Sequence, residues 1–89
     1  IPHAVLIEIE SFRETQQITH IETKIYVERP SQKSILIGAE GAMLKKIGTE
    51  ARRKLEKLLG QKVNLTLWVT VKENWTEDPG TLNRLQNAQ

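Results

Sequence analysis

The sequence predicts a single α+β domain in which a three-stranded sheet carries its helices on one face. Residues 5–12, 18–28 and 63–71 alternate apolar and polar side chains with the two-residue period of strands. Between the second and third of these segments lie a short predicted helix over residues 31–37 and a longer one over residues 42–59. A chain of 89 residues buries one modest core, so we expect one sheet face to be covered by the helices and the other to be free.

The first two strands are expected to pair as a hairpin. In the first strand, Val5, Ile7 and Ile9 share one side and Glu8 and Glu10 the other, which predicts a half-buried strand with its acidic side in solvent. The second strand alternates in the same way, and its predicted apolar side consists of Ile21, Thr23, Ile25 and Val27.

The two predicted helices are bounded by recognisable residues. Pro30 ends the second strand because proline cannot donate to a sheet, Ser31 is the predicted N-cap, and Gly38 closes the first helix. The second helix ends before Gly60, a typical left-handed C-cap. Its predicted buried stripe consists of Leu44, Ile47, Ala51, Leu55 and Leu58.

The third strand has the clearest alternation of the three. Its predicted inward side consists of Val63, Leu65, Leu67, Val69 and Val71. Beyond it we expect a turn at residues 76–80 and a short helix that begins at residues 82–85.

Composition argues against several classes of protein. No stretch reaches the roughly 20 apolar residues that cross a bilayer, and the absence of cysteine predicts a cytoplasmic protein without disulfides. His3 and His20 lack partners at a known ligand spacing, so we expect no catalysis, metal or cofactor in this chain. The net charge is only +2, but residues 33–62 hold eight basic and three acidic side chains, which favours a polyanionic partner.

The most informative stretch is the G-x-x-G sequence from Gly38 to Gly41, placed between the two predicted helices. Two such glycines permit a tight turn and let a phosphodiester backbone approach the main chain, while the next helix directs unpaired N–H groups at phosphates. We therefore expect about four nucleotides of single-stranded RNA here, with bases held by residues 35–37 and by the second strand. The predicted RNA-binding residues are Lys33, Ser34, Ile35, Ile37, Gly38, Ala39, Glu40, Gly41, Ala42, Leu44, Lys45 and Lys46.

This loop and its surroundings resemble a known family. A G-x-x-G loop in a β-β-α-α-β order is typical of a type II KH domain. Residues 2–5, 35–52 and 67–75 further resemble the C-terminal KH domain of the Era family of bacterial ribosome-associated GTPases. The resemblance implies one KH domain over residues 1–89, with the GTPase domain and the helix before the first strand outside this chain, so that part of the core is exposed.

The resemblance also implies partners. They are the 3′ end of small-subunit (16S) ribosomal RNA, the small ribosomal subunit during its assembly, and the GTPase domain of the parent protein. GTP and Mg are implied for the parent alone, as is a location in the cytoplasm, peripheral to the inner membrane. Glu40 departs from the family pattern, in which the loop often carries a basic residue, and its carboxylate is expected to weaken RNA binding.

Two features leave alternatives open. Trp68 points outward from the third strand, with Trp75 soon after, and such aromatic residues suit a covering segment, a protein-docking face or base stacking. The alternative function is therefore a KH-fold interaction or regulatory module that docks on the GTPase domain or ribosomal proteins. On the second helix, Lys45 and Arg52 share one flank. We expect Lys45 and Lys46 to contact RNA and the later cations to act at long range.

Overall fold

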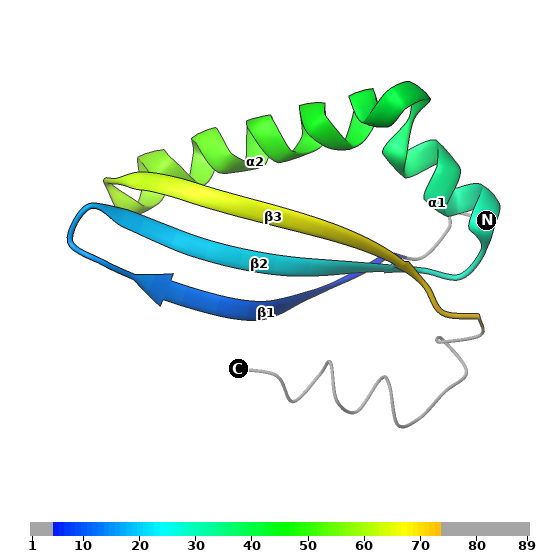
Figure 1. Cartoon of the computed structure of the whole chain (residues 1–89), viewed down its shortest axis with the longest axis horizontal. Helices are drawn as coiled ribbons and strands as arrows, with labels where there is room; N and C mark the ends of the chain where they lie inside the picture. The colour runs from blue at the N-terminus through cyan, green and yellow to red at the C-terminus, as the bar shows by residue number, and fades with distance from the viewer. Residues whose placement is uncertain (1–4, 74–89) are drawn as a thin grey trace.

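The structure is a computed structural model that describes residues 5–73, in the expected order of elements (Figure 1). The strands are β1 (Leu6–Glu14), β2 (Ile18–Val27) and β3 (Lys62–Val71). The helices are α1 (Pro30–Ile37) and α2 (Ala42–Leu59), joined by a short helical turn, η1 (Ala39–Gly41). His3, Trp75 and the turn and helix expected after residue 75 lie outside the described residues.

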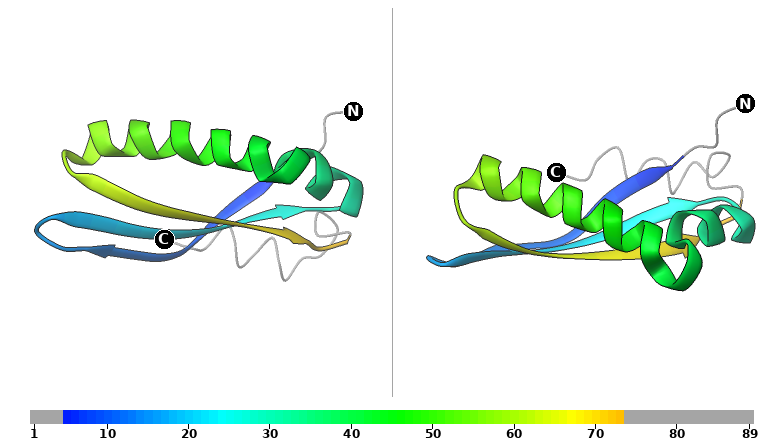
Figure 2. Two further views of the ribbon diagram at one scale, coloured as in Figure 1. Left: turned by 45° about the horizontal axis from the view of Figure 1, so that its top comes forward. Right: turned by 90° about the horizontal axis from the view of Figure 1, so that it is seen from above.

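The sheet has the order β1-β2-β3, so β2 is its central strand. β1 and β2 form the expected antiparallel hairpin, with a register shift between Ile9 and Ser11. β2 and β3 run parallel over their whole length, because the two helices between them return the chain to the end of the sheet where β2 began. Figure 2 shows α2 running along β3, with β1 at the opposite edge of the sheet.

The helix boundaries agree with the predicted ones except at the start of α1. The N-cap is Arg29 rather than Ser31, and the Gln32 side-chain oxygen accepts hydrogen bonds from the N–H groups of Glu28 and Arg29, both at 2.8 Å. Pro30 therefore opens the helix, where its missing N–H costs nothing. The predicted ends are confirmed, since Gly38 donates to the Ser34 carbonyl and Gly60 is left-handed.

Most of the core lies on the helix-facing side of β2 and at the start of β3. Ile21, Ile25, Val27 and Val63 are at most 5% exposed, and Thr19 and Thr23 are buried on the same side of β2. The predicted inward residues of β2 are confirmed. Tyr26 alternates with these residues and was expected to face outward, but it is only 4% exposed, and its hydroxyl donates to Glu8 at 3.0 Å. In β3 Val63 is buried, whereas the remaining inward residues are half-buried because β3 is an edge strand.

The predicted burial of the apolar side of β1 is wrong. Val5, Ile7 and Ile9 are 48%, 65% and 61% exposed. Among residues 5–73 the helices pack mainly on β3 and β2 rather than on β1, which leaves this side of β1 largely uncovered. Leu58 was also expected in the buried stripe of α2 but is 79% exposed, because it lies on the flank of the helix turned away from β3.

Candidate nucleic-acid interface

The loop between α1 and α2 has the backbone geometry that a close approach requires. Gly38 and Gly41 have φ values of 76° and 79°, in the left-handed region where glycine is favoured. A side chain at Gly38 would collide with Met43, since an added Cβ would lie 2.7 Å from the Met43 Cβ. Around Gly41 the space is open within 4 Å. The loop thus exposes main chain at Gly41, where no side chain blocks approach, while the N–H groups of Gly41 and Ala42 donate to the carbonyls of Gly38 and Ala39.

An open groove of about 390 Å³ begins at Gly41 and runs between α2 and β3. Its floor is apolar and comes from Leu44 on the helix and from Leu65 and Leu67 on the strand. Lys45 and Arg52 stand on its α2 side. The remaining lining residues are Gly48 and Thr49. A narrow apolar floor beside two cations and an accessible backbone loop suits an unstacked base with a phosphate nearby.

The predicted site residues divide into those at the groove and those elsewhere. Gly41, Leu44 and Lys45 line the groove, whereas Lys46 is exposed on α2 outside the lining. Ile35 is 73% exposed and lines a separate apolar hollow of about 180 Å³ with Val5 and Val27. The other predicted residues belong to α1, the loop and the first residue of α2 and are exposed or half-buried, namely Lys33, Ser34, Ile37, Gly38, Ala39, Glu40 and Ala42.

The strand that forms the groove differs from the expected one. The bases were assigned to the second strand, but β2 is central, and β3 is the strand beside α2. The sequence-based prediction did not include the lining residues Gly48, Thr49, Leu65 and Leu67, and it left Arg52 to long-range attraction. One signal was available: Lys45 and Arg52 are seven residues apart, which places them on the same helix flank.

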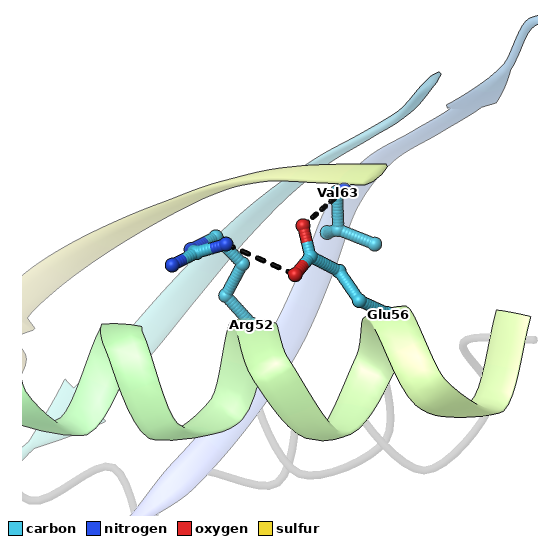
Figure 3. A network of polar contacts seen from close by, with 3 residues as sticks. All are labelled: Arg52, Glu56 and Val63. Atoms are coloured by element: carbon cyan, nitrogen blue, oxygen red, sulfur yellow. Dashed lines mark hydrogen bonds and ion pairs between the residues drawn. The ribbon is translucent and has the colours of Figure 1, made fainter. Parts of the chain in front are cut away.

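Arg52 belongs to a polar network that ties α2 to the start of β3 (Figure 3). Its Nη1 donates to Glu56 Oε1 at 3.0 Å, and the N–H of Val63 donates to Glu56 Oε2 at 3.0 Å. The hydrogen bond from Val63, and then the nearby Arg52 charge, hold the pKa of Glu56 below its ordinary value. One oxygen of this carboxylate thus accepts from Arg52 and the other from Val63, which holds Arg52 on the groove wall.

Glu40 stands in the loop with a left-handed backbone, φ 55° and ψ 26°. This conformation is unfavourable for a side chain with a Cβ. Glu40 is exposed and lies one residue before Gly41, the first residue of the groove lining, but does not itself line the groove. The loop therefore carries both backbone strain and a negative charge at this residue.

The opposite face of the sheet has a different character. Trp68 is 56% exposed there and pairs in register with Lys24, whose ammonium lies 3.0 Å from Glu10 and 5.9 Å from the Tyr26 ring centroid. His20 is within 3.2 Å of Asn64 on the same face. Within residues 5–73 no group of three or more acidic, histidine or cysteine side chains could hold a metal ion, and no helix is long and apolar enough to span a membrane.

The comparison with protein families decides how the groove is interpreted. A family model described as a KH domain matches residues 1–76. The chain belongs to the KH domain family. Its order of elements and its Gly38–Gly41 loop are those on which the resemblance was based, and the expectation of a KH fold is confirmed.

Individual relatives extend this result. The chain is 51% identical over 87 residues to the GTPase Era of Caldicellulosiruptor saccharolyticus and 45% identical over 86 residues to that of Leuconostoc citreum. Both matches cover 96% of this chain but only 29% and 28% of the relatives' lengths. The KH domain therefore corresponds to less than a third of these curated relatives.

Two solved structures have the same fold. One is a crystal structure of Aquifex aeolicus Era bound to GDP.AlF4-, with a TM-score of 0.86, and the other is Era in complex with MgGDPNP and nucleotides 1506–1542 of 16S ribosomal RNA, with a TM-score of 0.87. Each is 33% identical in sequence, and each match covers 96% of this chain and 29% of the solved chain.

Proposed function

We propose that this chain is a non-catalytic module that binds single-stranded RNA in the groove between α2 and β3. The observation that carries the proposal is the continuity of three features: the Gly41 main chain, the cations Lys45 and Arg52, and the apolar floor containing Leu67. The open space at Gly41 lets the phosphodiester backbone come close to the main chain, the cations suit its phosphates, and the floor suits the bases. We assign no direct contact in the groove to the remaining predicted residues, of which Ile35 lines the separate hollow. The others are Lys33, Ser34, Ile37, Gly38, Ala39, Glu40, Ala42 and Lys46.

The proposed target is the single-stranded 3′ end of small-subunit ribosomal RNA. The solved relative in complex with nucleotides 1506–1542 of 16S ribosomal RNA supports this choice, as does the identity of 51% to a GTPase Era. We further propose that the chain is the KH domain of an Era-type GTPase that acts in assembly of the small ribosomal subunit in the cytoplasm. GTP and Mg then belong to the GTPase domain of that parent protein, and peripheral contact with the inner membrane is proposed for the parent alone.

A fluorescence-anisotropy titration tests the proposal. The chain is mixed with a short labelled RNA that matches the 3′ end of 16S ribosomal RNA, beside a scrambled RNA and a DNA of the same sequence, at two salt concentrations. Saturable binding that prefers the matched RNA and weakens with salt supports the proposal. If a demonstrably folded chain binds none of the three, the proposed function is wrong.

A second candidate function rests on the opposite sheet face. Trp68 is 56% exposed there, away from the groove, and a large exposed aromatic residue favours a protein interface. Under this alternative the chain docks on the GTPase domain or on ribosomal proteins and binds RNA weakly because of Glu40. Trp68→Ala separates the two functions, since the variant would keep RNA binding and lose protein docking.

A further inference from the structure

The groove wall contains a cation whose charge is already partly neutralised. Arg52 and Glu56 are 3.0 Å apart on successive turns of α2, and their side chains are 38% and 27% exposed. An exposed pair at this spacing is weak in isolation. Here the carboxylate has a second anchor, since its other oxygen accepts the N–H of Val63, a residue only 4% exposed (Figure 3). The position of Glu56 is therefore set by both α2 and β3.

The hydrogen bond from Val63 to Glu56 satisfies a backbone N–H group at the edge of the sheet. β3 has β2 on one side only, so alternate N–H groups on its other edge lack a strand partner. Glu56 accepts the N–H of Val63 at that edge and at the same time receives Arg52. A carboxylate held at both oxygens has little freedom to rotate. The guanidinium of Arg52 is consequently tied to the groove wall through its Nη1, which restricts where it can lie in the groove.

A paired guanidinium suits one kind of RNA group better than another. A phosphate near Arg52 would also meet the negative charge of Glu56, which reduces the gain from neutralising it. A base edge is neutral and offers acceptor atoms, and the planar fork of arginine donates two parallel hydrogen bonds to such an edge when its orientation is fixed. Lys45 is seven residues away, about 10 Å along the helix axis, and carries no such pairing in the described part of the chain.

We propose that Glu56 is a positioning residue that orients Arg52, and that Arg52 so held reads the edge of one RNA base in the groove. This inference rests on the proposed function. It assigns different roles to Lys45 and Arg52, the two cations on the α2 side of the groove. Lys45 contributes salt-dependent affinity through phosphate, whereas Arg52 contributes sequence preference. The sequence preference therefore requires the guanidinium geometry of Arg52, whereas the salt-dependent affinity requires only a positive charge at Lys45.

The test measures anisotropy with the matched RNA, a scrambled RNA and a set of matched RNAs with one base replaced, over a range of salt concentrations. Arg52→Lys is expected to lower the ratio of matched to scrambled affinity about tenfold and to leave the salt dependence unchanged. Lys45→Ala is expected to lower both affinities alike and to reduce the salt slope by about 0.7. Arg53→Lys is the matched control, since Arg53 is exposed on α2 outside the groove lining, and it should have no effect.

The role of Glu56 is tested by coupling. Glu56→Gln should lower the ratio of matched to scrambled affinity, but by less than Arg52→Lys does. The double variant should have the same ratio as Arg52→Lys alone. A purely structural role would lower the melting temperature and leave the ratio unchanged. If Glu56→Gln is unfolded, the Arg52→Lys and Arg53→Lys pair still decides the base-reading claim, because both change exposed or partly exposed side chains.

Several results overturn the inference. One is that Arg52→Lys lowers the matched and scrambled affinities equally. Another is that Glu56→Gln lowers the ratio of matched to scrambled affinity as much in the Arg52→Lys variant as in the wild type. A wild-type chain that binds no RNA refutes the proposed function, and the inference falls with it. A wild-type chain that prefers the matched RNA, with no loss of preference in Arg52→Lys, refutes the inference alone.

Discussion

Gly48 of α2 faces Leu67 of β3 so closely that a Cβ added to the glycine would lie 3.4 Å from the Leu67 Cδ1. Both residues line the groove, so this contact helps set its width. Gly48→Ala places a methyl group there at ordinary contact distance. Because alanine is the better helix former, the free energy of unfolding should rise by up to about 1 kcal/mol in a urea titration. RNA affinity should fall, and a more stable variant with unchanged affinity would place the RNA elsewhere.

The two loop glycines should respond differently to substitution. Gly38→Ala forces a Cβ to within 2.7 Å of the Met43 Cβ and should therefore disrupt the loop and destabilise the chain by more than backbone strain alone. Gly41→Ala has open space and should cost only about 1 kcal/mol of left-handed strain. Gly41→Asp should fold as well as Gly41→Ala yet lose RNA binding, because its carboxylate meets the phosphate path. Thermal melts and anisotropy titrations compare the three, and Gly41→Asp binding like Gly41→Ala would contradict the loop's role.

Glu40 allows strain and charge to be separated. Glu40→Gly removes both, and its free energy of unfolding should rise by up to about 1 kcal/mol because glycine tolerates φ 55°. Glu40→Gln removes the charge alone and should leave stability unchanged. Both variants should bind RNA more tightly than the wild type, and Glu40→Lys more tightly still. Equal affinities for all four proteins at low salt would show that the carboxylate is remote from the phosphates.

The Val63 hydrogen bond lowers the pKa of Glu56, which gives stability a defined pH dependence. The folded chain holds the charged form more strongly than the unfolded chain does. The stabilisation is therefore complete above the pKa of an ordinary glutamate, about 4.3, and is lost as pH falls through the lower folded value. Urea titrations from pH 7 to below 4 should show this loss in the wild type and a shallower loss in Glu56→Gln. Parallel curves would contradict the assignment.

The two sides of the hairpin should differ in their tolerance of truncation. Ile25 in β2 is 5% exposed, and Ile25→Ala should cost about 2 to 5 kcal/mol of unfolding free energy. Ile9 in β1 is 61% exposed, and Ile9→Ala should cost much less, about 0.5 kcal/mol. Urea unfolding of the two variants beside the wild type measures both costs. A large cost at Ile9 would show that its side of β1 is covered in solution.

Local patterns predicted the elements well. The apolar side of β2, the helical repeat of α2 and the left-handed cap at Gly60 depend on neighbours within a few residues, and the structure confirms them, whereas Tyr26 on the outward side of β2 is buried as well. The N-cap of α1 was missed because Gln32 reaches back to the Arg29 N–H, a contact that the preference for serine at caps does not anticipate.

Long-range placement could not be predicted in the same way. The exposure of Ile7 depends on which strands the helices cover, and the membership of Leu67 in the groove depends on β3 lying beside α2. Neither relationship appears in the period of a single segment. The flank shared by Lys45 and Arg52 was visible in the sequence, but only the position of β3 turns that flank into a groove wall.

An NMR titration of the isotopically labelled chain with the matched RNA tests the groove most directly, because it reports every backbone amide at once. Binding in the groove predicts chemical-shift changes concentrated at Gly41, Lys45, Gly48, Thr49 and Leu67, with little change at Trp68. Changes confined to Trp68 and its neighbours on the outer sheet face, with the groove amides unmoved, would contradict the proposal that the groove between α2 and β3 binds RNA.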